Sequence, residues 1–306
     1  MHRFAKTGFI CTVLLLAAIC LAACNPYTYA EEGTLLVSAE ELADYIGAEN
    51  VAIVDMQSAE DYAAGHVEGA VNIALADLMI NVPVENMLTS PSRLSELMSA
   101  NGIGDDTLVI AYDSDKNSAS RFLWSMMVYG NNNVRVVDGG IAAIQAAGYA
   151  LTTETPTPEP AVFTAAEDKD PTWYVTISEM QQYVNEPSDE VVLLDVRSEE
   201  EYLTEGKIPG AIVMTHLNNF YSDGTFKDTT TTKINYLEAG MDPEKEIIIY
   251  CRTSVRAAPV FVSLYNAGYR NIRIFDGAWL EWTSNSSNPI EYADNSAPQT
   301  TVKDAS

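Results

Sequence analysis

Short apolar runs alternate with amphipathic stretches along most of the chain. The clearest apolar runs are rich in β-branched residues and end in an acidic residue or a cysteine: 51–55, 108–113, 191–195 and 247–251. Runs of this length and composition are typical of buried parallel strands. The stretches 92–102 and 256–268 place apolar residues at helical spacing and end in glycine, which predicts helices. The alternation predicts an α/β fold.

The same pattern occurs twice, at a spacing of about 140 residues. VAIVD (51–55) matches VVLLD (191–195), and VRVVDGG (134–140) matches IRIFDGA (272–278). Because several matching segments follow one another in the same order, we interpret the chain as a tandem duplication. Each copy is predicted to form a mainly parallel sheet covered by helices on both faces.

The first 24 residues predict export and lipidation. Arg3 and Lys6 precede an apolar run over 8–23 that is too short to span a bilayer comfortably. The run closes with Leu-Ala-Ala-Cys24, which resembles a bacterial lipoprotein signal, where cleavage precedes a cysteine that receives diacylglycerol. We therefore expect a lipid-anchored protein on the extracytoplasmic side of a bacterial membrane, in the cell envelope. A plain signal peptide or an uncleaved anchor is the alternative.

These features divide the chain into six predicted segments. They are a signal peptide (1–23), a lipidated tether (24–33), a first domain (34–153), a linker (154–171), a second domain (172–290) and a disordered tail (291–306). The linker is assigned because it is rich in proline, threonine and acidic residues, and the tail because it is polar.

The charge and the cysteines of the chain limit which partners, disulfides and cofactors are expected. The chain has 43 acidic and 17 basic residues, a net charge of -26, so phosphate backbones would repel it and nucleic acid is not expected as a partner. After cleavage, Cys24 carries lipid and Cys251 is the one cysteine of the domains, so no disulfide within the chain is expected. With only His66 and His216 beside that thiol, no metal site and no cofactor are expected.

The chemistry is predicted at the turn that follows the apolar run 247–250. Cys251 lies between a strand and a helix, where backbone N–H groups and the helix dipole favour negative charge. Arg252 and Arg256 add positive charge, so the cysteine is expected to be largely thiolate. The turn therefore predicts an activated sulfur nucleophile that faces an anionic substrate. The alternative is a cysteine that merely packs in the core, but the two flanking arginines disfavour it.

A series of motifs covers nearly the whole mature chain. In order they are GHVEGA (65–70), MLTSP (87–91), GIGDDT (102–107), DVR (195–197), IPGA (208–211), DGTFK (223–227), CRTSVR (251–256) and DGAWLEW (276–282). With these motifs the chain resembles the two-domain sulfurtransferases of the rhodanese family, which include thiosulfate and 3-mercaptopyruvate sulfurtransferases. The resemblance implies two tandem rhodanese-like domains. It also implies that the first is catalytically silent, because Asp113 stands where the second has Cys251.

The resemblance implies a transfer in two steps. Cys251 would take the outer sulfur of thiosulfate or 3-mercaptopyruvate as a persulfide, and a thiol or cyanide acceptor would remove it. Arg197 is implied to bind the donor, although a salt bridge to a neighbouring carboxylate is the alternative. The loop residues Arg252, Thr253, Ser254, Val255 and Arg256 are implied to bind the substrate and stabilise the persulfide. Ser254 stands where the family usually has glycine, and the loop sequence leaves the donor open.

Two other functions were weighed against sulfur transfer. A phosphatase of this fold needs an arginine six residues after the cysteine, but position 257 is alanine. The second is a membrane-tethered persulfide carrier, or a thiol redox sensor, that is not an enzyme. The sequence separates this alternative poorly from the enzyme, because both use the same thiolate.

Overall fold

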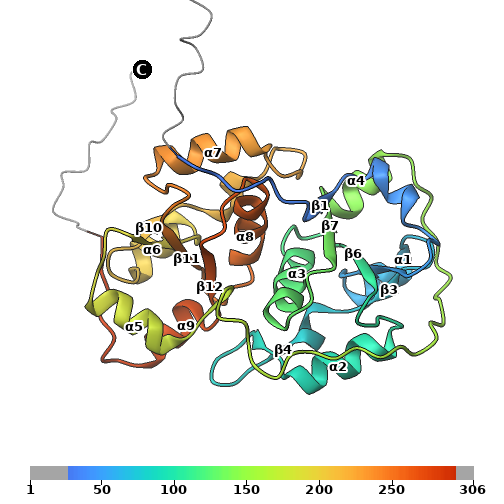
Figure 1. Cartoon of the computed structure of the whole chain (residues 1–306), viewed down its shortest axis with the longest axis horizontal. Helices are drawn as coiled ribbons and strands as arrows, with labels where there is room; N and C mark the ends of the chain where they lie inside the picture. The colour runs from blue at the N-terminus through green and yellow to red at the C-terminus, as the bar shows by residue number, and fades with distance from the viewer. Residues whose placement is uncertain (1–26, 294–306) are drawn as a thin grey trace, which may run out of the picture.

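The computed structural model describes residues 27–293, so the predicted signal peptide, Cys24 and most of the predicted tail lie outside the described residues. Two α/β domains lie side by side, one built from each copy of the repeat (Figure 1). No helix among residues 27–293 combines the length and the hydrophobicity that a membrane crossing requires.

Each domain is organised around a five-stranded parallel sheet. The first sheet has the spatial order β1 (Leu36–Val37), β7 (Val134–Val137), β6 (Leu108–Tyr112), β2 (Val51–Asp55) and β3 (Val71–Asn72). The second has the order β8 (Tyr174–Val175), β12 (Ile272–Phe275), β11 (Glu246–Tyr250), β9 (Val191–Asp195) and β10 (Ile212–Val213). Every neighbouring pair in both sheets is parallel. The predicted α/β class and the duplication are confirmed.

Helices connect the strands and cover both faces of each sheet. In the first domain they are η1 (Glu40–Asp44), α1 (Ala59–Ala64), η2 (Leu75–Leu78), α2 (Pro91–Ala100), α3 (Ser118–Val128) and α4 (Gly140–Ala146), with an added antiparallel pair, β4 (Met79–Ile80) and β5 (Met87–Leu88). In the second they are α5 (Ile177–Asn185), α6 (Glu199–Glu205), η3 (His216–Asn219), α7 (Thr229–Glu238), α8 (Ala257–Asn266) and α9 (Ala278–Ser284). The two predicted helices are α2 and α8.

The inner faces of the two sheets share one hydrophobic core. Strand residues alternate between faces, so Val109 and Ala111 of β6 enter the shared core while Ile110 and Tyr112 enter an outer one. Every residue of α3 is buried, as are nearly all of α8, and the two helices pack together between the sheets. An apolar core of this kind, continuous across the boundary, makes the two domains one packed unit.

The two domains also exchange polar contacts through equivalent residues. Asp138, after β7, accepts a hydrogen bond from the backbone N–H of Phe226 in the second domain at 2.7 Å. Asp276, which stands 138 positions later, accepts one from the backbone N–H of Leu88 in the first domain at 3.0 Å. Of these two aspartates, only Asp276 also forms a buried ion pair, because Arg121 Nη2 lies 2.5 Å from its Oδ1. The duplication thus places the domains in a pseudo-twofold arrangement.

The connecting segments are more firmly packed than their composition predicts. The backbone N–H of Ala30 donates to the carbonyl of Gly268, so the predicted tether lies against the second domain. Phe163 of the predicted linker is buried against the first domain. Glu291, predicted to begin the disordered tail, instead forms a backbone pair with Lys207. These segments are ordered because hydrogen bonds to distant residues hold their backbones.

Candidate active site

Cys251 lies at the carboxyl end of the central strand β11, where the chain turns towards α8. It is 1% exposed, and its carbonyl accepts a hydrogen bond from the backbone N–H of Trp279 at 3.0 Å. The carbonyl of Arg252 accepts another from the N–H of Leu280 at 3.2 Å. The start of α9 therefore holds the first two residues of the loop in place. Within residues 27–293 it is the one cysteine, and its thiol is free.

The turn depends on a left-handed residue at position 254. Ser254 has φ +60°, a conformation that favours glycine because other residues bring Cβ close to the carbonyl. Its buried hydroxyl donates to the carbonyl of Phe275, which fixes the loop against β12. Lys116, 138 positions earlier, has the same conformation with φ +66°. The loop therefore keeps its backbone form in both domains although neither has glycine there.

The first domain fills its own loop with a carboxylate. Asp113 stands at the position of Cys251, and its two oxygens accept hydrogen bonds from the backbone N–H groups of Lys116 at 3.1 Å and Ala119 at 2.9 Å. These donors correspond to Ser254 and Ala257 of the second domain. The amides of this loop therefore bind an anionic side chain at the site where the second domain carries its sulfur.

The loop of the first domain has almost no free space around Asp113. Burial raises the pKa of Asp113 to about 7, in spite of the two hydrogen bonds that its carboxylate accepts. Phe220 and Phe226 of the second domain line the space around it, which amounts to about 10 Å³. Such a space is far smaller than a small-molecule site. The assignment of the first domain as silent stays a prediction that this geometry supports.

Arg256 lies beside the nucleophile and is held by a carboxylate. Its Nη1 and Nη2 each donate to one oxygen of Glu201 on α6, both at 2.7 Å. The hydrogen bonds to Glu201 and the interaction with Cys251 raise the pKa of Arg256 above its ordinary value. The same pairing lowers the pKa of Glu201 to about 2. The predicted neighbour of the sulfur is thus in place, and its charge is shared with Glu201.

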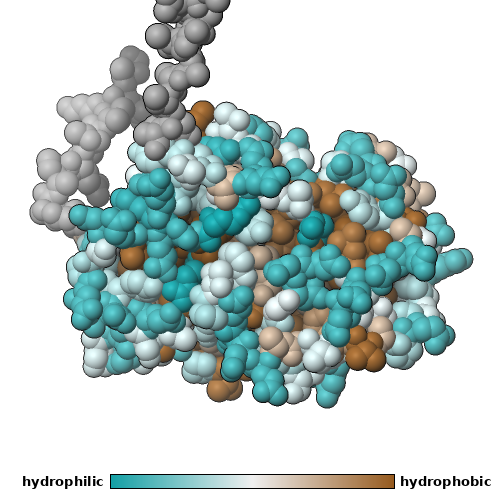
Figure 2. Space-filling model, viewed as in Figure 1, coloured by the Kyte–Doolittle hydropathy of each residue, from teal (hydrophilic) through white to brown (hydrophobic). Residues whose placement is uncertain are grey.

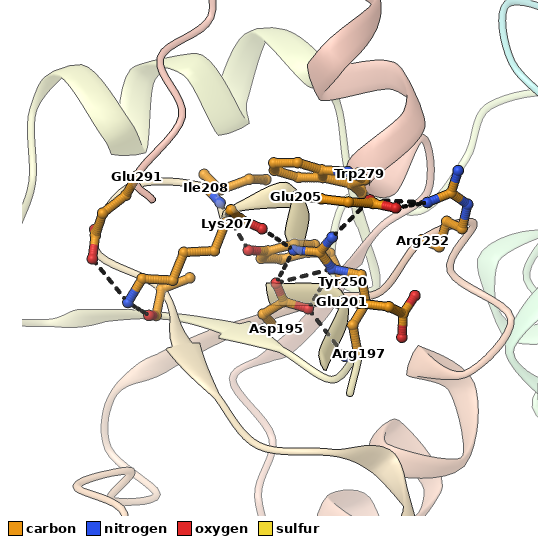
Figure 3. A network of polar contacts seen from close by, with 12 residues as sticks. Asp195, Arg197, Glu201, Glu205, Lys207, Ile208, Tyr250, Arg252, Trp279 and Glu291 are labelled. Carbon is orange, nitrogen blue, oxygen red and sulfur yellow. Dashed lines mark hydrogen bonds and ion pairs between the residues drawn. The ribbon is translucent and has the colours of Figure 1, made fainter. Parts of the chain in front are cut away.

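The other two predicted cations are paired as well (Figure 3). Nη1 of Arg252 donates to both carboxylate oxygens of Glu205, at 2.8 and 2.9 Å. The side chain of Arg197 is fully buried, bonded to the carboxylate of Asp195 and packed over the ring of Trp279 at 4.2 Å. This is the salt bridge that the sequence left as the alternative for Arg197, and its role in donor binding stays a prediction.

The remaining predicted loop residues are Thr253 and Val255. Thr253 and Val255 are half-buried, and the carbonyl of Val255 accepts a hydrogen bond from Ala258 at 3.3 Å in the first turn of α8. The loop therefore leads directly into the amino end of α8, which favours negative charge.

Three site residues were missed by the sequence reasoning. Glu201 and Glu205 have a spacing of four, which places them on one face of α6, but the sequence analysis predicted no helix there. His216 has no such signal, and it lies near Arg256 only because η3 packs on α8. Burial, with a smaller effect of Arg256, lowers the pKa of His216 to about 4, so its imidazole is neutral at ordinary pH.

No group of three or more histidine, cysteine or acidic side chains within the described residues is arranged to hold a metal ion. Hydrophilic side chains dominate the molecular face in Figure 2, in keeping with the acidic composition. The loop offers a cysteine thiol, backbone amides and paired arginines for chemistry.

Fold and site together define a tandem α/β protein with one cysteine-bearing loop and one loop that has lost the cysteine. The model of the rhodanese-like domain matches residues 38–147 and 176–285, and the chain belongs to the rhodanese family.

Curated relatives span nearly the whole chain. The thiosulfate sulfurtransferase of Corynebacterium glutamicum is 29% identical over 287 residues, which cover 87% of this chain and 93% of the relative. The thiosulfate sulfurtransferase of Cricetulus griseus is 29% identical, over 74% of this chain and 80% of the relative. Among solved structures, wild-type EanB has a TM-score of 0.77 at 24% identity, covering 86% of this chain and 70% of that one, and supports the fold alone.

Proposed function

We propose that the protein is a sulfurtransferase that carries a sulfane sulfur on Cys251. The observation that carries the proposal is the occupied loop of the first domain, where the backbone N–H groups of Lys116 and Ala119 hold the Asp113 carboxylate. The equivalent residues of the second domain, Ser254 and Ala257, belong to the loop that begins with Cys251. A cradle that holds a carboxylate can stabilise a persulfide anion, because both place negative charge at the same point.

The reaction moves one sulfur atom in two steps. The Cys251 thiolate attacks the outer sulfur of the donor, and a new S–S bond forms. The bond between that sulfur and the rest of the donor breaks, and its electron pair stays on the departing group. That group is sulfite when the donor is thiosulfate and pyruvate when it is 3-mercaptopyruvate. A thiol or cyanide then attacks the outer sulfur of the persulfide and restores the thiolate. The relatives named thiosulfate sulfurtransferase favour thiosulfate as the first donor to test.

The test compares the wild-type protein with Cys251→Ser. Wild type should transfer sulfur from thiosulfate or 3-mercaptopyruvate to cyanide, and mass spectrometry should find one added sulfur atom on the peptide that contains Cys251. The serine variant should lose both signals, because its alkoxide is not available at neutral pH. Transfer that persists in the serine variant would refute the proposal.

A carrier or redox sensor is the second candidate, because buried Cys251 is a free thiol in a loop suited to an anion. A carrier would acquire the added sulfur without catalytic turnover of either donor. A sensor would instead form a sulfenic acid with peroxide and show no added sulfur. The same mass spectra distinguish the two.

We further propose that the protein is a lipoprotein of the bacterial cell envelope, anchored through Cys24. The basic start, the apolar run over 8–23 and the Leu-Ala-Ala-Cys ending support this. Metabolic labelling with a palmitate analogue should mark the wild-type protein and the membrane fraction should contain it. Cys24→Ser should lose the label. A labelled serine variant would contradict the assignment.

A further inference from the structure

We infer that Glu201 and Glu205 determine which donor charge the site accepts. The site selects a sulfur donor of low negative charge over a dianion. The inference rests on the proposed sulfur transfer and goes further by naming the substrate class. The class is an organic hydropersulfide, R–S–SH, whose reacting end carries at most one negative charge.

The first argument is that both carboxylates are firmly placed. Glu201 is the third residue of α6, and its Oε2 accepts hydrogen bonds from the backbone N–H and the hydroxyl of Ser198, at 2.9 and 3.1 Å. This capping box fixes Glu201 at the amino end of the helix, where negative charge is favoured. Glu205 follows four residues later on the same face. The two carboxylates are therefore part of the site's fixed structure.

The second argument is the balance of charge around the thiol. Arg256 is paired with Glu201 and Arg252 with Glu205, each through two hydrogen bonds. Arg197, fully buried, is paired with Asp195. These six side chains have no net formal charge. Beside these pairs, an incoming anion meets the loop amides and the helix end, equivalent to about half a positive charge. It also meets the field of Lys116 of the first domain, whose charge reaches His216 near Arg256.

The consequence differs between donors. Thiosulfate brings two negative charges to a nearly buried thiolate, and the paired arginines cannot compensate them without leaving Glu201 or Glu205. A hydropersulfide brings at most one. The Cys251 thiolate attacks its outer sulfur, the S–S bond breaks with its electron pair on the inner sulfur, and that thiolate leaves. The proton of the donor's S–H passes to the leaving thiolate, so the enzyme retains a persulfide anion.

The experiment measures kcat/KM with three donors of different charge: thiosulfate, 3-mercaptopyruvate and cysteamine persulfide, which carries an ammonium group. Wild type should prefer cysteamine persulfide to thiosulfate. Glu201→Gln and Glu205→Gln keep the size of the side chain and one acceptor for the arginine. Each should raise kcat/KM for thiosulfate by about five- to tenfold, chiefly through KM, and lower it for the ammonium donor.

The matched control is Glu200→Gln. Glu200 is exposed on the same helix, and the described residues provide it with no ion pair. This variant changes the net charge equally and should alter the donor preference less than twofold. A control that shifts preference as much as Glu201→Gln would overturn the inference. So would an equal change with all three donors, because a purely structural role would affect each donor alike.

A second readout does not depend on sulfur transfer. Alkylation of Cys251 by iodoacetate, an anion, is compared with alkylation by neutral iodoacetamide, and peptide mass spectrometry follows this cysteine alone. The iodoacetate-to-iodoacetamide rate ratio should rise about fivefold in Glu201→Gln. An unchanged ratio would overturn the inference even if sulfur transfer is confirmed. A raised ratio would support it even if no donor turns over, which separates this inference from the proposed function.

Discussion

The buried ion pair between Arg121 and Asp276 allows a test of how the two domains are held together. Both side chains are fully buried, and the Asp276 carboxylate also accepts the backbone N–H of Leu88. In Asp276→Asn the amide oxygen can keep one of these hydrogen bonds. The guanidinium of Arg121 then stays buried without its counter-ion.

The magnitude follows from the cost of an unpaired buried charge. Removing one partner of a buried pair destabilises a protein by about 3 to 5 kcal/mol. For a unit of this size, 1 kcal/mol lowers the melting temperature by about 2 °C. Asp276→Asn should therefore melt about 6 to 10 °C below wild type.

The repeat supplies a matched control. Asp138 occupies the equivalent position and accepts the backbone N–H of Phe226, but no cation is paired with it in the described part of the chain. Its burial raises the pKa of its carboxyl group, so a neutral amide suits the site. Asp138→Asn should stay within about 1 kcal/mol of wild type.

The assay is thermal unfolding followed by circular dichroism, with the wild type and both variants measured in one buffer. A further variant, Arg121→Met combined with Asp276→Asn, removes both charges and should recover at least half of the loss. Equal melting temperatures for Asp276→Asn and Asp138→Asn would refute the reasoning. A double variant no more stable than Asp276→Asn would refute it as well.

Two further substitutions test the loops of the two domains. Ser254→Gly and Ser254→Ala both lose the hydrogen bond to Phe275, but only glycine accommodates φ +60° without strain. The glycine variant should therefore be more stable than the alanine variant by about 1 kcal/mol in urea unfolding. Equal stabilities of the two variants would contradict the backbone assignment. Burial raises the pKa of Asp113 to about 7, above its value of about 4 in the unfolded chain. The unfolded state therefore loses its proton first, and wild type should lose stability relative to Asp113→Asn as pH rises from about 4 to about 7, then level off. A stability difference that does not depend on pH would contradict this.

The fold was largely predictable because its signals are local. Strands buried on both faces are recognisable as short apolar runs, and α2 and α8 have helical spacing and a glycine near their ends. Because the pattern is repeated, the elements predicted for one domain also predict those of the other. The strand order and the shared core were not predictable in this way, because they depend on which faces meet after the chain has folded.

The connecting segments show where composition misleads. The predicted linker is rich in proline and threonine, yet the side chain of Phe163 is buried. Residues 29–33 precede the first domain in the sequence but lie against the second, where Tyr29 packs on Tyr269 with ring centroids 5.4 Å apart. A polar composition describes the average solvation of a segment. A polar composition does not show that a single aromatic side chain packs against residues far away in the sequence.

Part of the candidate site could be predicted from the sequence, and part could not. The sequence by itself was enough to predict Cys251 as the nucleophile and to place its loop, because a cysteine between a strand and a helix lies in the turn whose amides favour negative charge. The sequence also identified Asp113 as the replaced nucleophile. Only the tertiary structure decided that the loop amides hold this carboxylate, and that Arg256 and Arg252 are already paired with Glu201 and Glu205.

The physical reason is the range of the interactions involved. A turn and a helix end are formed by residues within about one turn of each other, so their chemistry can be inferred from neighbours in the sequence. The ion pair of Arg256 and Glu201 joins residues 55 positions apart. Its strength depends on a distance and a degree of burial that exist only once α6 and the loop lie together. The sequence thus predicted which atom would react, and the fold decided the charge that surrounds it.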